Sequence, residues 1–428
     1  MTNNFVFLPK CELEPIHELP DPFLRPDGTR VQTPDQWPEQ REYLKAMLTH
    51  YLYGTVPPPP GNTRGEVTFR RMVYNGRAIA ETVRITCGPE DSIQFDCELI
   101  RPAKEGKVPV ITWNQFKDRH GSPDEEDAVL NHGYAIIEFE KEQLAQDNAN
   151  AIHGPLAKAY PGYTWGAIAM WAWAQSRVVD YLATTEYADM DRIVATGHSR
   201  GGKVALCAAI YDERFALCAA SGSGCGGAGC LRYLGSRMGE GIGICETAGS
   251  IEDVFPFWWS DNFGEFGKRV ATYTRSNAPL FEDFQQAAEM LQPQVLGKTQ
   301  DEDRLPFDLH FLRACIAPRP VITTEGLSDT WANPYGSQLT WRAADEVYQF
   351  LGAAGKNALA MRDGPHEYQK LDWMHVIAFC DTMFYGKAPH KNIQRRAPDA
   401  RTQMDGIPGA DWRELCPHFS WRMPKTET

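Results

Sequence analysis

A serine in a tight glycine turn is the residue of this chain best suited to do chemistry. Ser199 lies in the run Gly-His-Ser-Arg-Gly, which fits the pattern G-x-S-x-G. That pattern is typical of a sharp strand-to-helix corner that exposes a serine hydroxyl above a sheet. The residues on either side of the motif support such a corner, because residues 191–196 form a β-branched run of strand length and residues 203–211 are rich in helix formers. We interpret Ser199 as a nucleophile; the alternative is a structural serine at an ordinary turn.

A serine nucleophile needs a base, and the base needs a carboxylate to orient it. Of the histidines that follow Ser199, only His366 lies in a short loop between a strand-like run, 358–361, and a helix-like run, 373–383. We therefore predict that His366 is the base. His375 lies on the apolar helix itself, so we interpret it as a core residue.

The carboxylate that orients the base is expected just past the end of a buried strand. The strand-like run 321–324 leads into Glu325-Gly-Leu-Ser-Asp329. Asp329 is the first choice, since a residue beyond the strand end turns more freely into a site. Glu325, still on the strand, is the second choice. Asp329 can also be interpreted as a turn or helix cap.

Two cations adjoin the serine. The backbone N–H of Arg200 follows the nucleophile, where an oxyanion donor is expected, and its guanidinium adds positive charge. Lys203 lies one helical turn beyond Ser199 on the same face. The pair suggests an acyl group that is anionic or rich in hydroxyls; surface salt bridging is the alternative.

Tryptophans and glycines surround these candidates. We expect Trp331, near Asp329, and Trp259 to contact substrate, because an indole offers an apolar face and a polar N–H. Trp171 and Trp173 are assigned to the core. The segment 221–230 contains G-x-G-x-x-G, but it follows the helix after Ser199 and a further strand, deep in the chain, whereas a dinucleotide fingerprint belongs at the first strand-to-helix turn. It therefore predicts close backbone packing instead of a dinucleotide site. No metal or nucleotide motif is recognised, and we expect no cofactor.

The elements that position these residues alternate along the chain. From residue 108 onward, short buried strands alternate with helices, which predicts a mostly parallel sheet with helices on both faces. Residues 66–100 alternate like leading antiparallel strands, with a turn at Asn75-Gly76. We predict an N-terminal arm at 1–60, a catalytic domain at 61–390 and a tail at 391–428.

Bulk properties exclude some function classes. A net charge of -13 argues against nucleic acid or an anionic membrane as partner. No stretch reaches transmembrane length, and no signal peptide is recognised, so the sequence as written fits the cytoplasm, or the periplasm or exterior if a leader has been removed. Eleven cysteines without a regular spacing fit free thiols at least as well as disulfides. We expect a monomer.

Taken in order, five stretches resemble one family of enzymes. They are Gly-His-Ser-Arg-Gly-Gly-Lys, the segment 221–230, Leu-Pro-Phe-Asp-Leu-His-Phe from residue 305, Ala-Pro-Arg-Pro from residue 317 and the His366 loop. Over about residues 40–385 the chain resembles the glucuronoyl esterases, carbohydrate esterase family fifteen. The resemblance implies a single α/β-hydrolase domain, a three-layer sandwich without cofactor.

The resemblance also implies an activity, the hydrolysis of esters of (4-O-methyl-)glucuronic acid such as those joining glucuronoxylan to lignin. It gives Ser199, His366 and Arg200 the roles stated above and makes Lys203 a ligand for sugar hydroxyls. Glu246 is similar to the family's sugar-contacting Gln/Glu position. An acetyl xylan esterase or general carboxylesterase is the alternative, and a carbohydrate-binding pseudoenzyme is the non-enzyme alternative.

The chain departs from the fungal pattern at the acid and at a disulfide. Fungal members carry a catalytic glutamate where this chain has Gly222, whereas the bacterial pattern of an aspartate two residues before a tryptophan matches Asp329 and Trp331. The fungal cysteines beside the serine and the histidine correspond here to His198 and Glu367, so that disulfide cannot form.

Overall fold

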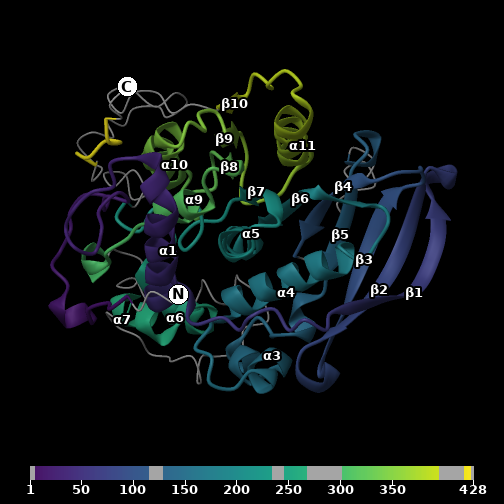
Figure 1. Cartoon of the computed structure of the whole chain (residues 1–428), viewed down its shortest axis with the longest axis horizontal. Coiled ribbons are helices and arrows are strands. Elements are labelled where there is room, and N and C mark those ends of the chain that lie inside the picture. Colours follow the sequence, from purple (N-terminus) through teal and green to yellow (C-terminus); the bar gives the residue numbers. More distant parts are fainter. Residues whose placement is uncertain (1–4, 115–128, 234–244, 268–300, 395–418, 426–428) are drawn as a thin grey trace.

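A mixed sheet is the centre of the computed structural model, which describes residues 5–114, 129–233, 245–267, 301–394 and 419–425. Within these ranges the strands are ordered β1-β2-β3-β5-β4-β6-β7-β8-β9-β10 (Figure 1). From β5 to β9 every neighbouring pair runs parallel, while β1, β2, β3 and β5 pair antiparallel. The predicted parallel sheet with leading antiparallel strands is confirmed. The strands are β1 (Arg64–Val73), β2 (Ala78–Cys87), β3 (Ile93–Pro102), β4 (Val108–Trp113), β5 (Ala135–Phe139), β6 (Ala188–His198), β7 (Phe215–Ser221), β8 (Val321–Gly326), β9 (Asn357–Arg362) and β10 (Ile393–Gln394).

Helices cover both faces of the sheet. Successive strand residues point to opposite faces, so Val110 packs into the cluster that contains α4 and α5, whereas Ile111 packs into the cluster that contains α11. Figure 1 shows α4 and α5 on one side of β6 and β7, and α11 on the other. The helices are α1 (Trp37–Leu48), α3 (Pro155–Ala159), α4 (Ala167–Leu182), α5 (Arg200–Tyr211), α6 (Ala248–Val254), α7 (Asp261–Gly267), α9 (His310–Ile316), α10 (Pro334–Phe350) and α11 (Lys370–Tyr385). None of those described is long and apolar enough to cross a membrane.

The two ends of the chain contain structure that the sequence analysis did not assign. Strand β10 belongs to the tail and pairs antiparallel with β9. The last described segment returns to the arm, where the Trp421 indole donates a hydrogen bond of 2.6 Å to the carbonyl of Leu19. The division into arm, catalytic domain and tail stays a prediction, and these contacts show that arm and tail pack on each other.

A buried histidine in this region makes stability depend on pH. His310 is fully buried, and its Nε2 lies 2.9 Å from the carbonyl oxygen of Pro20. Burial is the main cause that lowers its pKa from 6.5 to about 4. Between these values the unfolded chain binds a proton that the folded chain does not, so stability falls as pH drops through this window.

We expect this group to remove about 3 kcal/mol of stability between pH 6.5 and pH 4. His310→Gln keeps a donor for Pro20 without a titrating ring, so its unfolding free energy should vary less with pH. Urea unfolding of both proteins at several pH values measures the difference. Identical slopes for the two proteins would contradict the assignment.

Candidate active site

A strained corner presents Ser199 at the carboxyl end of β6. Its backbone has φ of 56° and ψ of -126°, a conformation that L residues rarely adopt, and α5 begins at the next residue. A Cβ on Gly197 would lie 2.2 Å from the carbonyl oxygen of Gly201, so only glycine permits this approach of strand and helix. The predicted strand-to-helix corner is present.

Two hydrogen bonds join Ser199, His366 and Asp329. The Ser199 Oγ lies 2.9 Å from His366 Nε2, and His366 Nδ1 lies 2.6 Å from Asp329 Oδ2. The Asp329 side chain is 1% exposed, while that of His366 is 34% exposed. A carboxylate that accepts from Nδ1 fixes the tautomer in which Nε2 can take a proton from the serine. The three residues chosen from the sequence therefore meet in the geometry of a nucleophile, a base and an orienting acid.

Asp329, and not Glu325, forms the hydrogen bond with His366 Nδ1. Glu325 is 1% exposed at the end of β8, where the side chain of Ser337 lies beside its carboxyl group. Burial, and then the charge of Asp329, raise its pKa to about 8. A carboxyl that stays protonated at neutral pH provides no charge to orient a base, so the geometry favours Asp329.

The absence of a side chain at Gly222 has a steric reason. Gly222 has φ of 49°, and a Cβ there would lie 2.9 Å from His198 Cε1 and 3.4 Å from Asp329 Oδ2. The space beside the base is already filled from β6 and from the Asp329 loop. An acid at position 222 and an acid at position 329 would compete for the same volume. The glycine-rich segment packs closely here, as predicted.

His198 contacts the candidate base directly. The centroids of the His198 and His366 rings lie 4.7 Å apart, and His198 Nδ1 lies 3.3 Å from Ser221 Oγ. Burial, and then the charge of His366 and of nearby arginines, lower the pKa of His198 to about 3. His198 is therefore neutral near pH 7, and its ring packs against that of His366.

Asp147 holds the Arg200 guanidinium, a contact that the sequence analysis missed. Arg200 Nη1 lies 2.5 Å from Asp147 Oδ2, and the Trp258 indole donates to the other carboxylate oxygen at 2.8 Å. Burial alone would raise the pKa of Asp147, but Arg200 and Lys141 outweigh it and hold the pKa at about 2. Asp147 follows β5 in the chain, but no local pattern points to Arg200, which lies 53 residues further on.

Asn114 stabilises the strand-to-helix corner at Ser199, and the sequence analysis did not identify this residue. It is fully buried just after β4, and its Nδ2 donates to the carbonyl oxygen of Gly201 at 2.9 Å and of Thr196 at 3.2 Å. These bonds tie the first turn of α5 to β6. The segment 115–128 that follows lies outside the described residues.

Lys203 and Glu246 form a buried ion pair one helical turn beyond Ser199. Lys203 Nζ donates to Glu246 Oε2 at 2.7 Å and to the carbonyl oxygen of Ser223 at 2.9 Å, and both charged residues are at most 4% exposed. Glu246 also accepts from the N–H of Cys225 at 2.9 Å and from the Trp331 indole at 3.0 Å. Three of the residues predicted to bind substrate thus form one network.

Trp259 was predicted to contact substrate, and the structure places it in the core instead. Its side chain is fully buried and packs on Tyr53, Phe263 and the backbone of Gly226. A large apolar ring beside a glycine without a Cβ gains more from burial than from partial exposure at a rim. Trp331 is half-buried and remains beside Asp329.

Proteins similar to this chain are esterases by name. A family model described as "Glucuronyl esterase, fungi" matches residues 83–281 and 274–352. The chain is 28% identical over 437 residues to "Carbohydrate esterase MZ0003" of an unknown prokaryotic organism, covering 87% of this chain and 91% of that protein. It is 29% identical over 355 residues to the 4-O-methyl-glucuronoyl methylesterase of Cerrena unicolor, covering 81% of this chain and 65% of that protein.

Solved structures agree. A carbohydrate esterase family 15 glucuronoyl esterase from Caldicellulosiruptor kristjansonii superposes with a TM-score of 0.70 at 28% identity, over 92% of this chain and 97% of the other. The glucuronoyl esterase from Solibacter usitatus gives a TM-score of 0.70 at 24% identity, over 87% and 100%, and supports the fold alone. The predicted α/β-hydrolase fold is confirmed.

Proposed function

The chain belongs to the glucuronyl esterase family, whose model covers more than half of its length, and we propose that it hydrolyses esters of D-glucuronic acid or its 4-O-methyl ether through an acyl-enzyme. The observation that carries the proposal is the pair of hydrogen bonds from Ser199 to His366 and from His366 to Asp329. The names of relatives, which include several 4-O-methyl-glucuronoyl methylesterases, support the substrate class.

The proposed reaction uses these residues in order. Ser199 Oγ attacks the ester carbonyl while His366 Nε2 takes its proton, and Asp329 stabilises the imidazolium that forms. The N–H of Arg200 and its guanidinium, fixed by Asp147, stabilise the negative charge on the carbonyl oxygen. His366 then gives the proton to the leaving alcohol, and water hydrolyses the glucuronoyl ester of Ser199 by the same steps.

We assign sugar recognition to the network beyond the serine. Lys203 and Glu246 bring an ammonium and a carboxylate close to the position of the acyl group, and Trp331 adds an aromatic face. Hydroxyls on a sugar ring can accept from the ammonium and donate to the carboxylate. This arrangement suits a hydroxyl-rich acyl group better than an acetyl group, which has nothing to offer either charge.

The substrate test compares two acyl groups. We expect rapid release of benzyl alcohol from benzyl D-glucuronate and little release of acetate from acetylated xylan. No turnover of the glucuronate ester together with rapid deacetylation would make the chain an acetyl xylan esterase or general carboxylesterase. Binding of xylan without turnover of any ester would make it a carbohydrate-binding pseudoenzyme.

Asp147→Asn should lower turnover of benzyl D-glucuronate by about ten- to a hundredfold, less than the loss of an oxyanion donor itself. Asparagine still accepts from the Trp258 indole, but it no longer balances the charge of Arg200 and Lys141. The guanidinium then has no fixed position, so kcat should fall more than KM rises. Steady-state kinetics separates the two constants. An unchanged kcat would mean that Asp147 serves only packing.

A further inference from the structure

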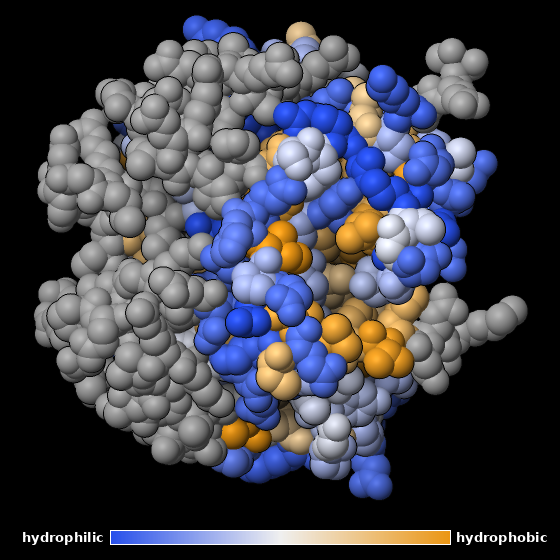
Figure 2. Space-filling model, turned by 90° about the vertical axis from the view of Figure 1, so that its left-hand side faces the viewer, coloured by the Kyte–Doolittle hydropathy of each residue, from blue (hydrophilic) through white to orange (hydrophobic). Residues whose placement is uncertain are grey.

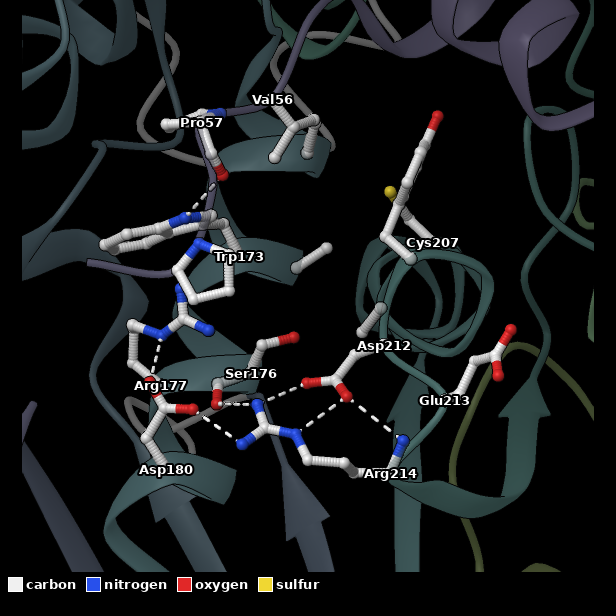
Figure 3. A pocket seen from close by; sticks show the side chains of 15 residues that line it. Val56, Pro57, Trp173, Ser176, Arg177, Asp180, Cys207, Asp212, Glu213 and Arg214 are labelled. Carbon is white, nitrogen blue, oxygen red and sulfur yellow. Dashed lines mark hydrogen bonds and ion pairs between the residues drawn. The ribbon is translucent and has the colours of Figure 1, made fainter. Parts of the chain in front are cut away.

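A second cavity lies away from the serine, along α4 and the second half of α5. It has a volume of about 230 Å³ and is lined by α4, by the second half of α5 and by the proline-rich segment at residues 56–59 (Figure 3). The helix α5 starts at the active-site corner and ends at this cavity, so about 15 Å of helix separates the two. The cavity is therefore distinct from the site described above.

One wall of the cavity is apolar. Trp173, Val56 and Pro57 line it, and the small side chains of Ala172 and Ala208, which also line the cavity, leave the space open. The Trp173 indole donates to the carbonyl oxygen of Pro57 at 3.1 Å, which fixes the ring as a rigid side of the cavity. This wall offers apolar surface of the kind that the C–H face of a ring can cover.

The opposite wall is charged, as Figure 3 shows. Asp180 pairs with Arg177 at 2.6 Å and with Arg214 at 2.7 Å, and Arg214 also pairs with Asp212 at 2.7 Å. Glu213 adds a further carboxylate to the lining. Glu213 is itself paired with Arg41, so each of the three acids has an arginine partner.

Arg177 brings unused hydrogen-bonding capacity to this wall. Its side chain is 2% exposed, its guanidinium stacks on Trp173 at 4.6 Å, and its Nη1 has no hydrogen-bond partner among the described residues. A buried guanidinium N–H without an acceptor is unfavourable, since it has lost water and gained nothing. A ligand oxygen in the cavity would supply the missing acceptor.

The charges on this wall determine which kind of ligand oxygen can bind there. The arginines of the wall are already paired with carboxylates, so the wall has no net positive charge to hold a carboxylate or a phosphate. A hydroxyl accepts from Arg177 and donates to Asp180 or Asp212, so it satisfies both signs. The volume is below the roughly 300–1,000 Å³ of sites for drug-sized ligands, which limits the occupant to about one ring. We propose that this cavity binds a single neutral sugar ring, with its apolar face on the Trp173 wall and its hydroxyls on the Arg177 and Asp212 wall.

The test uses the full chain and the Trp173 indole N–H as a local probe, assigned by comparison with Trp173→Phe. We expect methyl β-D-xylopyranoside, added up to about 50 mM, to shift this ¹⁵N–¹H resonance in a saturable way. D-glucuronate has a similar ring but carries a charge, and it should shift the Trp173 resonance at least tenfold more weakly. No shift with the xyloside, or equal responses to both sugars, would overturn the proposal.

Variants locate the binding. Ala172→Leu fills the cavity and should abolish the shift. Arg177→Lys keeps the charge beside Asp180 but removes the unused N–H, so we expect about tenfold weaker binding. This variant replaces Ala172→Leu as the test if Ala172→Leu does not fold. Arg84→Lys changes an arginine that pairs with Asp96 on the sheet and is the matched control. Binding unaffected by both cavity variants would place the sugar elsewhere and overturn the proposal. None of these readouts depends on ester hydrolysis.

Discussion

Asp329→Asn is expected to lower the turnover of benzyl D-glucuronate by about four orders of magnitude, as in serine enzymes whose orienting aspartate is replaced by its amide. The amide keeps the shape of the carboxylate that lies 2.6 Å from His366 Nδ1, but it removes the charge that stabilises the imidazolium. It also permits the tautomer in which Nε2 no longer accepts the serine proton. Steady-state kinetics measures the loss, and circular dichroism checks that the variant is folded.

Glu325→Gln is the matched control. Burial, followed by the charge of Asp329, raises the pKa of Glu325 to about 8, so at neutral pH its carboxyl is protonated and glutamine closely resembles it. We expect turnover within a few-fold of wild type. If Glu325→Gln abolishes turnover while Asp329→Asn leaves it nearly unchanged, the assignment of the acid is wrong. Comparable partial losses in both would mean that the two carboxyls share the role.

Lys203→Met should destabilise the folded chain by about 3–5 kcal/mol, because it leaves a buried carboxylate without its cation. Glu246 is 4% exposed and would keep only the bonds from Cys225 and Trp331. Methionine is close to lysine in volume, so a cavity does not confuse the result. Denaturant unfolding at constant pH gives the change in free energy.

The double variant separates the ion pair from its surroundings. Lys203→Met combined with Glu246→Gln removes both charges, and glutamine still accepts a bond from the Trp331 indole. We expect the double variant to be more stable than Lys203→Met alone, which a double-mutant cycle expresses as a coupling energy. Additive effects of the two substitutions would show that the pair contributes nothing to stability.

Local sequence signals predicted the part of the site that depends on short-range structure. The corner at Ser199 follows from glycines at fixed offsets between a β-branched run and a helical run. His366 and Asp329 follow from a simple topological fact, that parallel strands bring their carboxyl ends to one edge. Each choice needed only the ends of predicted strands.

Contacts between distant segments account for what was missed. Asp147 lies 53 residues before Arg200, and nothing in either local sequence indicates their pairing. The sequence analysis placed Trp259 at the rim of the site because of its residue type. In the structure, the absence of a side chain at Gly226 leaves room for the Trp259 ring in the core. The sequence analysis assigned no strand to the tail, because β10 is short and forms a strand by pairing with β9.

Steric competition explains a departure from the fungal pattern that the sequence alone could only record. The volume next to Gly222 is occupied by His198 and Asp329. If the acid follows β8, as we propose for Asp329, a residue without a side chain is favoured after β7. The two positions of the acid are alternatives in one small space.

Trapping of the acyl-enzyme tests the central claim most directly. The chain is mixed with benzyl D-glucuronate, quenched in acid within the first turnovers, and the peptide that contains Ser199 is analysed by mass spectrometry. The account predicts a glucuronoyl adduct on Ser199 in wild type, and neither adduct nor turnover in Ser199→Ala. Turnover in Ser199→Ala within a few-fold of wild type, or an adduct on another residue, would contradict it.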